Sequence, residues 1–338
     1  MTITIALDAM GGDHAPRAVI DGALLAEKRN PKVQFILVGQ EEAIHKELDQ
    51  AGVARDRFGI RHASQVVAMD EKPATAMRTK RDSSIRVGAN MVKSREVDAL
   101  VSSGNTGALM AIARYVLKTL PGIDRPAIAS IVPSIPGKTL MLDLGANVDC
   151  SVDHLCQFTL MGRVFAESYW GMDNPRIGLL NIGEEEMKGN EVVRQAGEIL
   201  KQTEKFFIGN VEATDVFLGG VDVVVCDGFV GNVSLKTAEG VAKMLSHFLK
   251  EAFGQSLLSK IGYLFAAPAL KKFRSRVDPR EYNGALLLGL NGVVVKSHGG
   301  ADGLAFSTAI QTAVKLATHQ VTDKIRQNVI PMQEAEKK

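Results

Sequence analysis

The amino-acid sequence predicts an α/β fold, a Rossmann-like and mostly parallel sheet flanked by helices. Short β-branched runs alternate with stretches of helical periodicity along the whole chain, as expected for βαβ units. Several of these runs are continuously apolar, which is typical of parallel strands buried on both faces. The 338 residues are 46% hydrophobic, which is enough for one large domain or two smaller ones. Because no repeat or low-complexity linker marks a boundary, we expect one α/β unit over residues 1–338.

The individual elements follow from these periodicities. Eight runs are predicted to be strands: Thr2–Leu7, Val33–Val38, Ala99–Val101, Ala127–Val132, Thr139–Leu142, Arg176–Leu180, Phe206–Val211 and Val221–Cys226. Four stretches between them are clearly helical in pattern: Pro16–Arg29, Glu41–Ala51, Val152–Trp170 and Glu191–Gln202.

The chain changes character after Cys226. Apolar residues recur at steps of three and four over Asn232–Phe253, which predicts a long amphipathic helix. An apolar stretch over 255–270 follows and leads into a basic cluster. We expect residues 232–276 to protrude from the body, and the charged tail 333–338 to be frayed. The basic cluster comprises Lys271, Lys272, Arg274 and Arg276.

Composition excludes several classes of function. The net charge is +2, from 40 basic and 38 acidic residues, and this balance gives no global sign of a nucleic-acid partner. The N-terminus has no basic region and reaches Asp8 too early for a signal peptide. No uncharged apolar run reaches about 18 residues, so we expect no membrane span. Three cysteines without metal spacing, Cys150, Cys156 and Cys226, favour a reduced, cytosolic chain in which they fill the core.

Six glycine-rich clusters follow strands or precede helices. Because ligands bind at the carboxyl ends of strands in open α/β sheets, we expect the six clusters to share one edge. Free N–H groups at helix N-termini bind anions there, so together they predict an anion-binding active site. Any one of them alone is more simply a turn. The clusters are Asp8–Pro16, Ser102–Gly107, Asp143–Asn147, Asn181–Glu185, Asp227–Asn232 and Ser297–Asp302.

The common nucleotide and hydrolase motifs are absent. The chain contains no G-x-G-x-x-G, no G-x-x-x-x-G-K-[ST], no G-x-S-x-G and no H-E-x-x-H. Phosphate-type recognition must therefore be achieved without these devices. No metal and no cofactor is indicated by any motif.

Single residues in the clusters have two interpretations each. His14 could contact an anion or lock its loop, and the same holds for His298. Lys188 could bind a substrate anion, or pair in solvent with the acidic run at 184–186. The carboxylates that end strands could bind substrate or only cap turns: Asp8, Asp143 and Asp227.

The segment 255–276 also has two interpretations. An apolar helix that contains Tyr263 and Phe265 and continues into basic residues suits an anionic lipid surface. The same residues could form a helix hairpin or a subunit interface. The pattern alone favours neither. The side chains expected to contact lipid are Leu257, Leu258, Ile261, Leu264, Phe265, Lys271 and Lys272.

The motifs in order resemble one family. The string Ala6–Pro16, followed by Val101–Ala108, Leu142–Asn147, Leu180–Glu184, Asp227–Asn232 and His298-Gly, is similar to the bacterial phosphate acyltransferases of phospholipid synthesis. The resemblance covers residues 1–320. It implies the fold of phosphotransacetylases and isocitrate-type dehydrogenases, and a homodimer in the cytoplasm that associates peripherally with the membrane.

The resemblance also implies a reaction. A fatty acyl group would pass from acyl carrier protein to inorganic phosphate, and a membrane glycerol-3-phosphate acyltransferase would use the acyl phosphate. Phosphate is itself a nucleophile and a thiol, with a pKa of about 8.5, is a good leaving group, so no covalent intermediate is expected. The alternatives are a phosphotransacetylase acting on acyl-coenzyme A and a non-catalytic acyl- or phosphate-binding scaffold.

The hypothesis assigns roles to named residues. Phosphate is expected on Ser103, Gly104, Asn105 and Thr106, where a strand meets a helix N-terminus. The catalytic set is Lys188, Asn232 and His14. Lys188 and Asn232 are a cation and an amide that could neutralise phosphate and polarise the thioester oxygen, and His14 could contact an anion. The remaining substrate-binding candidates are Asp8, Gly11, Gly12, Asp13, Asp143, Gly145, Asn147, Asn181, Gly183, Asp227, Gly228, Gly231 and His298.

Overall fold

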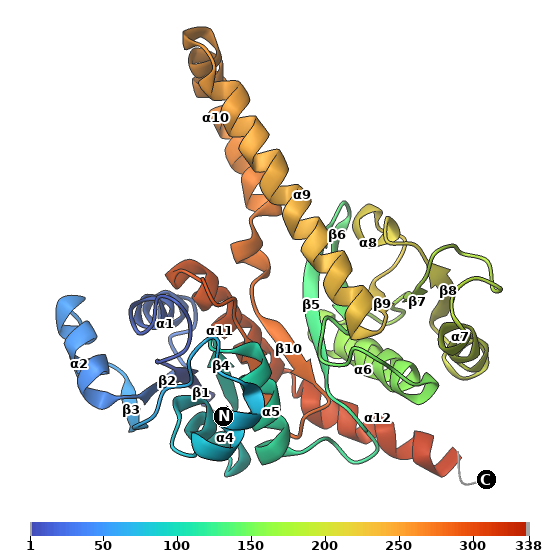
Figure 1. The fold of residues 1–338 in the computed structure, drawn as a ribbon, viewed down its shortest axis with the longest axis horizontal. Coiled ribbons are helices and arrows are strands. Elements are labelled where there is room, and N and C mark those ends of the chain that lie inside the picture. The colour runs from blue at the N-terminus through green and yellow to red at the C-terminus, as the bar shows by residue number, and fades with distance from the viewer. Residues whose placement is uncertain (1, 336–338) are drawn as a thin grey trace.

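The sheet runs through the whole molecule (Figure 1). A computed structural model describes the backbone of residues 2–335 and the side chains of residues 2–273 and 278–329. Within these residues one 11-stranded sheet has the order β3-β2-β1-β4-β11-β10-β5-β6-β9-β7-β8. The strands are β1 (Thr4–Asp8), β2 (Gln34–Gly39), β3 (Gly59–His62), β4 (Ala99–Ser102), β5 (Ala127–Ser134), β6 (Gly137–Leu142), β7 (Ile177–Leu180), β8 (Phe207–Val211), β9 (Val223–Val225), β10 (Ala285–Leu288) and β11 (Val293–Lys296).

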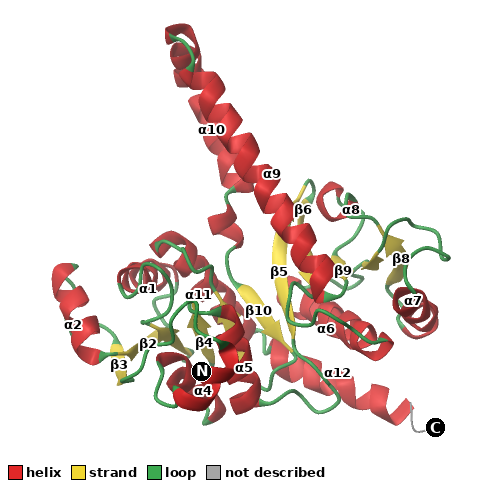
Figure 2. Cartoon of the chain, in the orientation of Figure 1, coloured by secondary structure: helices red, strands yellow, loops and turns green. Residues whose placement is uncertain are grey.

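Helices cover both faces of this sheet (Figure 2). They are α1 (Arg17–Arg29), α2 (Glu41–Gln50), α3 (Pro73–Thr79), α4 (Ser84–Lys93), α5 (Thr106–Leu117), α6 (Val152–Trp170), α7 (Glu191–Thr203), α8 (Asp215–Leu218), α9 (Gly228–Gly254), α10 (Leu257–Val277), α11 (Gly303–Thr318) and α12 (Val321–Ala335), with a 3-10 turn η1 (Pro279–Tyr282).

Two apolar clusters, one on each face, hold the layers together. Successive residues of a strand point to opposite faces, so Leu7 packs in one cluster and Ala6 in the other. Phe306 of α11 belongs to the first cluster, and Leu109 of α5 belongs to the second. Both faces of the sheet are buried, which explains the continuously apolar strands. The expected α/β class with a mostly parallel sheet is confirmed.

The strand directions divide the sheet into two blocks. In the first block, β3, β2, β1, β4 and β11 are mutually parallel, and in the second block β6, β9, β7 and β8 are mutually parallel. Between them, β10 pairs antiparallel with β11 and with β5, and β5 pairs antiparallel with β6. Three reversals leave the second block running opposite to the first.

This reversal corrects the expectation of one shared edge. The carboxyl ends of β1, β4 and β11 lie at one edge of the sheet, whereas those of β6, β9 and β7 lie at the opposite edge. The glycine-rich clusters therefore form two groups of three. Sequence periodicity reports that a strand exists and carries no information on its direction.

The predicted elements are all present, with ends shifted by a few residues. Each of the eight predicted strands and four predicted helices is found, and α6 has the predicted bounds. Three strands were not predicted: β3, β10 and β11. Each has only four residues, and β3 lies at the end of the sheet, where most of its side chains are exposed.

The α9–α10 hairpin extends well beyond the body (Figure 1). The expected amphipathic helix corresponds to α9, and the apolar segment lies in α10, which has Pro268 in its interior. The side chains of Arg274 and Arg276 lie outside the described ones. At the C-terminus, α12 packs along α6 and extends to Ala335, and residues 336–338 lie outside the description.

Candidate active site

Three loops meet at the edge of the first block. Ser103 Oγ, after β4, donates to the carbonyl of Gly11, after β1, at 2.6 Å. The N–H of Asp13 donates to the carbonyl of Gly299, after β11, at 2.9 Å. A Cβ on Gly12, whose φ is +96°, would come within 2.6 Å of Ser103 Oγ. The loops are therefore joined tightly, and Gly12 is required by their close approach.

Asp8, the last residue of β1, is the buried residue that holds these loops in place. It is fully buried, and Ser102 Oγ donates to its Oδ2 at 2.6 Å while the N–H of Gly104 donates to Ser102 Oγ at 3.0 Å. Burial raises the pKa of Asp8, and the bond from Ser102 opposes that shift. A Cβ on Gly11 would lie 2.4 Å from Asp8 Oδ2. Asp8 thus fixes the loops and does not face solvent.

Asn105 begins α5 and is held on both sides. Its Oδ1 accepts from the N–H of Ala108 at 3.0 Å, which caps the helix. Its Nδ2 donates to the carbonyls of Met69 and Glu71, both at 2.9 Å. Asn105 therefore orients the helix and the neighbouring loop. The exposed N–H groups available to an anion are those of the first turn, which starts at Thr106.

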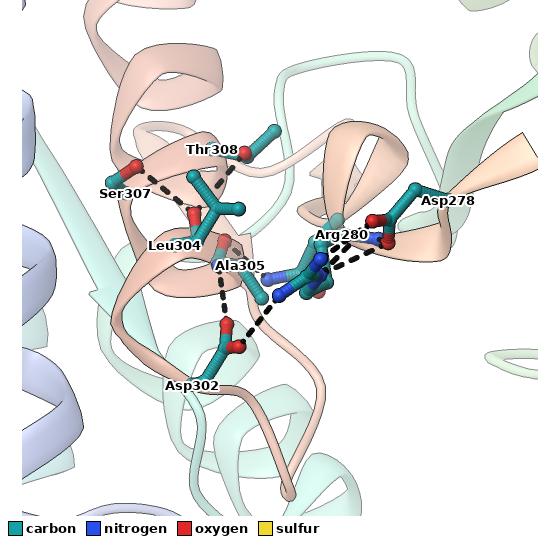
Figure 3. Close-up of polar contacts among 8 residues, drawn as sticks. Asp278, Arg280, Asp302, Leu304, Ala305, Ser307 and Thr308 are labelled. Carbon is teal, nitrogen blue, oxygen red and sulfur yellow. Dashed lines mark hydrogen bonds and ion pairs between the residues drawn. The ribbon is translucent and has the colours of Figure 1, made fainter. Parts of the chain in front are cut away.

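The second helix N-terminus at this edge is that of α11. Asp302 caps it by accepting from the N–H of Ala305 at 2.9 Å. Arg280 donates to Asp302 at 3.1 Å and to Asp278 at 2.7 Å, as Figure 3 shows. Because Asp278 ends α10, this ion-pair network connects the base of the hairpin to the start of α11.

The two candidate histidines of this edge differ. His298 Nδ1 accepts from the N–H of Gly300 at 3.1 Å, and the N–H of His298 donates to Asn283 at 3.0 Å. This supports the loop-locking interpretation for His298. The side chain of His14 is exposed, and its carbonyl accepts from the N–H of Ala18 at the start of α1.

A second buried carboxylate organises the opposite edge. Asp143 accepts from the N–H of Ile128 at 2.9 Å and from the N–H and Nδ2 of Asn147 at 2.7 and 2.9 Å. Burial raises its pKa, and these bonds oppose that shift. A Cβ on Gly231 would stand 1.9 Å from the carbonyl oxygen of Asp143, so only glycine lets α9 approach.

The start of α9 lies against this loop. Asp227 caps the helix by accepting from the N–H of Val230 at 2.8 Å, and the N–H of Gly228 donates to Asn147 at 2.7 Å. Asn232 is exposed at the start of the second turn of α9, and a Cβ on Gly145 would lie 2.8 Å from its Nδ2. The Asn232 amide therefore stands over the Asp143 loop.

Lys188 lies in the loop after β7, the strand next to β9. Asn181 fixes that loop by donating to the carbonyl of Lys188 at 3.1 Å. A Cβ on Gly183 would lie 3.2 Å from Lys188 Cγ, so the lysine stem crosses this glycine. Glu186 pairs with Lys201, and Lys188 forms no ion pair with any described residue. The predicted pairing of Lys188 with its neighbouring glutamates is therefore not present in the described part of the chain.

Sequence reasoning missed one charged residue at the first edge. Lys296 ends β11 and is only 8% exposed. The signal was available, because a lysine that closes an apolar strand and precedes Ser297-His298-Gly299 is unusual for a buried position. The described residues contain neither a metal-binding cluster nor a membrane-spanning helix. No group of three or more His, Cys, Asp or Glu side chains could hold a metal there. No helix in the described part of the chain is long and apolar enough to cross a membrane.

The fold of this chain is similar to that of solved phosphotransacylases. The chain superposes on a phosphotransacetylase from Streptococcus pyogenes with a TM-score of 0.64 and 18% identity over 94% of each chain. A branched-chain phosphotransacylase from Enterococcus faecalis gives a TM-score of 0.56 and 13% identity, over 93% of this chain and 99% of that one. The architecture is therefore that of the phosphotransacylases.

The sequence comparisons are more specific. Residues 3–324 match the family described as "Fatty acid synthesis protein". A phosphate acyltransferase of Magnetococcus marinus is 64% identical over 97% of this chain and 96% of its own length, and one of Halorhodospira halophila is 56% identical over the same shares. The chain belongs to the phosphate acyltransferase family and is an acyltransferase. This confirms the resemblance.

The Asp302 cap yields a stability prediction. Asp302→Ala should lower the free energy of unfolding by about 1 kcal/mol, because the first turn of α11 loses its cap. Asp302→Asn keeps a capping oxygen and should cost less, since exposed ion pairs contribute little. The bond from Ala305 holds the pKa of Asp302 below its usual 3.8, so this stabilisation is present above that pH and is lost as pH falls. Urea unfolding measures all three effects, and an equal loss in both variants would assign the effect to Arg280 pairing.

Proposed function

We propose that the protein transfers a long-chain acyl group from acyl carrier protein to inorganic phosphate, and that the acyl phosphate is used by a membrane glycerol-3-phosphate acyltransferase. Family membership supports acyl transfer in lipid synthesis. The observation that supports phosphate as acceptor is the edge of the first block, where three tightly joined loops surround the exposed first turn of α5. Helix N-termini of this kind bind phosphate through their N–H groups.

The reaction proceeds by direct attack. A phosphate oxygen forms a bond to the thioester carbonyl carbon, and the carbon–sulfur bond then breaks to release the carrier thiolate, which takes a proton from solvent. The thiolate is a good leaving group because a thiol has a pKa of about 8.5. Holding phosphate beside the carbonyl supplies on the order of 7–11 kcal/mol at best, and Lys188 and Asn232 are the proposed donors to the developing oxyanion.

The proposed phosphate site and the proposed oxyanion donors lie at opposite edges of the sheet. Phosphate is assigned to the loops after β4, whereas Lys188 and Asn232 lie at the other edge of the same sheet. A two-fold dimer can set the first edge of one subunit against the second edge of its partner, and the two-fold axis then repeats the same contact for the other two edges. We therefore propose a homodimer in which Lys188 and Asn232 serve the phosphate site of the other subunit.

Mixing two inactive variants tests this arrangement. Thr106→Glu places a negative charge at an exposed helix start, where it is tolerated by the fold but repels phosphate. Lys188→Ala removes the proposed oxyanion donor and should cost about 100- to 1000-fold in turnover. Co-refolded 1:1, they should regain roughly a quarter of wild-type turnover, because half of the dimers contain one intact site. If each variant is inactive and the mixture is too, the site is not shared.

The reaction itself is tested with purified protein and palmitoyl-acyl carrier protein. Free carrier thiol should appear only when phosphate is added, and acyl phosphate should form in equal amount. Palmitoyl-coenzyme A serves as the matched donor, and a preference for it would favour the phosphotransacetylase alternative. Thioester binding without phosphate-dependent thiol release would favour a non-catalytic scaffold.

The hairpin is proposed to contact the membrane peripherally, with the body in the cytoplasm. Its tip exposes Leu257, Leu258, Leu264 and Phe265, each more than 70% accessible, and Ile261 is half-exposed. Lys271 and Lys272 are exposed further along α10. Apolar insertion together with attraction of about 1 kcal/mol per basic residue suits an anionic lipid surface. The shaft of α9, meaning its middle turns around Val241–Leu249, also exposes apolar side chains, and we propose that they pack against the other subunit.

Two matched substitutions separate lipid contact from packing. Leu258→Glu at the tip should weaken binding to anionic vesicles, and added salt should weaken it further. Val241→Glu, also apolar and exposed but on the shaft, should leave vesicle binding unchanged. Sedimentation with vesicles and light scattering measure the two properties. Leu258→Glu that dissociates the dimer while retaining vesicle binding would establish the packing interpretation of the tip.

A further inference from the structure

Lys296 lies where the loops of the first edge meet. It ends β11 opposite Ser102 of β4, and its Nζ donates to the carbonyl of Ser103 at 3.3 Å and to that of Ser297. These carbonyls belong to the loops that lead into α5 and α11. The buried ammonium of Lys296 therefore connects the loop before α5 with the loop before α11.

The charge of Lys296 has no close counterion among the described side chains. Its nearby carboxylates, Asp8 and Asp13, act on it through space and make no ion pair with it within 4.0 Å in the described part of the chain. Burying an ammonium beside neutral carbonyls alone is unfavourable. Burial accordingly lowers the pKa of Lys296 to about 8, against the opposing effect of Asp8 and Asp13.

An anion at the start of α5 would relieve this imbalance. The Ser103–Gly104 peptide lies between Lys296, which binds its carbonyl, and Ser102, which accepts from its N–H. The helix dipole of α5 and the ammonium contribute positive potential at the same place. Both features favour a group with two negative charges over one with a single charge.

We propose that Lys296 is a positioning residue for the acceptor phosphate, supplying the buried positive charge that selects the dianion and holding the Ser103–Gly104 peptide that supports the phosphate loop. This rests on the proposed phosphate-acceptor function and deepens it. It assigns to Lys296 no contact with the acyl donor.

Lys296→Met tests the proposal, because methionine is similar in length and carries no charge. The KM for phosphate should rise at least about tenfold, the effect of losing a charge-assisted interaction, while the KM for the acyl donor stays within twofold. Phosphate should raise the Tm of the unmodified protein and should fail to raise that of the variant. A purely structural lysine would change the Tm without changing the phosphate dependence, and that result would overturn the proposal.

Lys138→Met provides the matched control. Lys138 is a strand lysine on β6 that stacks over the ring of Trp170 at 4.7 Å, and burial lowers its pKa as well. Its loss should leave the KM for phosphate unchanged. If Lys138→Met changes that KM as much as Lys296→Met does, the role of Lys296 is refuted.

A pH profile gives an independent readout. In the unmodified protein the KM for phosphate should rise as pH increases through about 8, since Lys296 loses its charge there, and the rise should be absent in Lys296→Met. The other titratable groups described at this edge are Asp8, Asp13, His14, His298 and Asp302. All of them are unchanged in Lys296→Met, so a difference between the two pH profiles reports on Lys296. If the unmodified protein shows no phosphate-dependent thiol release at any pH, the proposed function fails. If phosphate raises the Tm of the unmodified protein and of Lys296→Met equally, the role of Lys296 fails separately.

Discussion

The reversal of strand direction between β11 and β6 is the constraint on which the arrangement of the molecule depends. Two antiparallel strands, β10 and β5, join blocks that are each parallel, and the sheet remains continuous across them. Each block keeps the rule that polar loops follow the carboxyl ends of parallel strands. Because the two blocks run in opposite directions, three polar loops lie at one edge of the sheet and three at the other. A chain with one sheet therefore has two separate polar surfaces.

Each surface is built on a buried aspartate at the end of its strand. Asp8 and Asp143 have no access to solvent, and each organises its loop by accepting hydrogen bonds from hydroxyl, amide or backbone donors. The glycines beside them are fixed by contact distances too short for a Cβ. A carboxylate held in this way is costly to bury and is stable only while its donors stay in place. The loops are therefore rigid. An anion that binds to rigid loops loses less free energy in ordering them, and its affinity is higher for that reason.

The sequence predicted the elements well, and it predicted that polar, glycine-rich loops follow the strand ends. Apolar runs and helical periodicity located α6 and the longer strands because burial on both faces imposes those patterns. The same patterns could not give strand direction, since β5 and β6 read alike whether parallel or antiparallel. The glycine clusters do follow strand ends, as expected, yet Asn105 holds the 68–71 loop. Lys296 was overlooked because β11, the four-residue strand that it closes, was not predicted.

The attachment of the α9–α10 hairpin has a mechanical consequence. The hairpin begins at Asp227, beside the Asp143 loop, and ends at Asp278, where Arg280 connects it to the cap of α11. Its two bases are thus set in the two different polar surfaces of the chain. Because α9 and α10 pack against each other, a load on the tip would be shared between these two attachments, and neither polar surface would receive it alone.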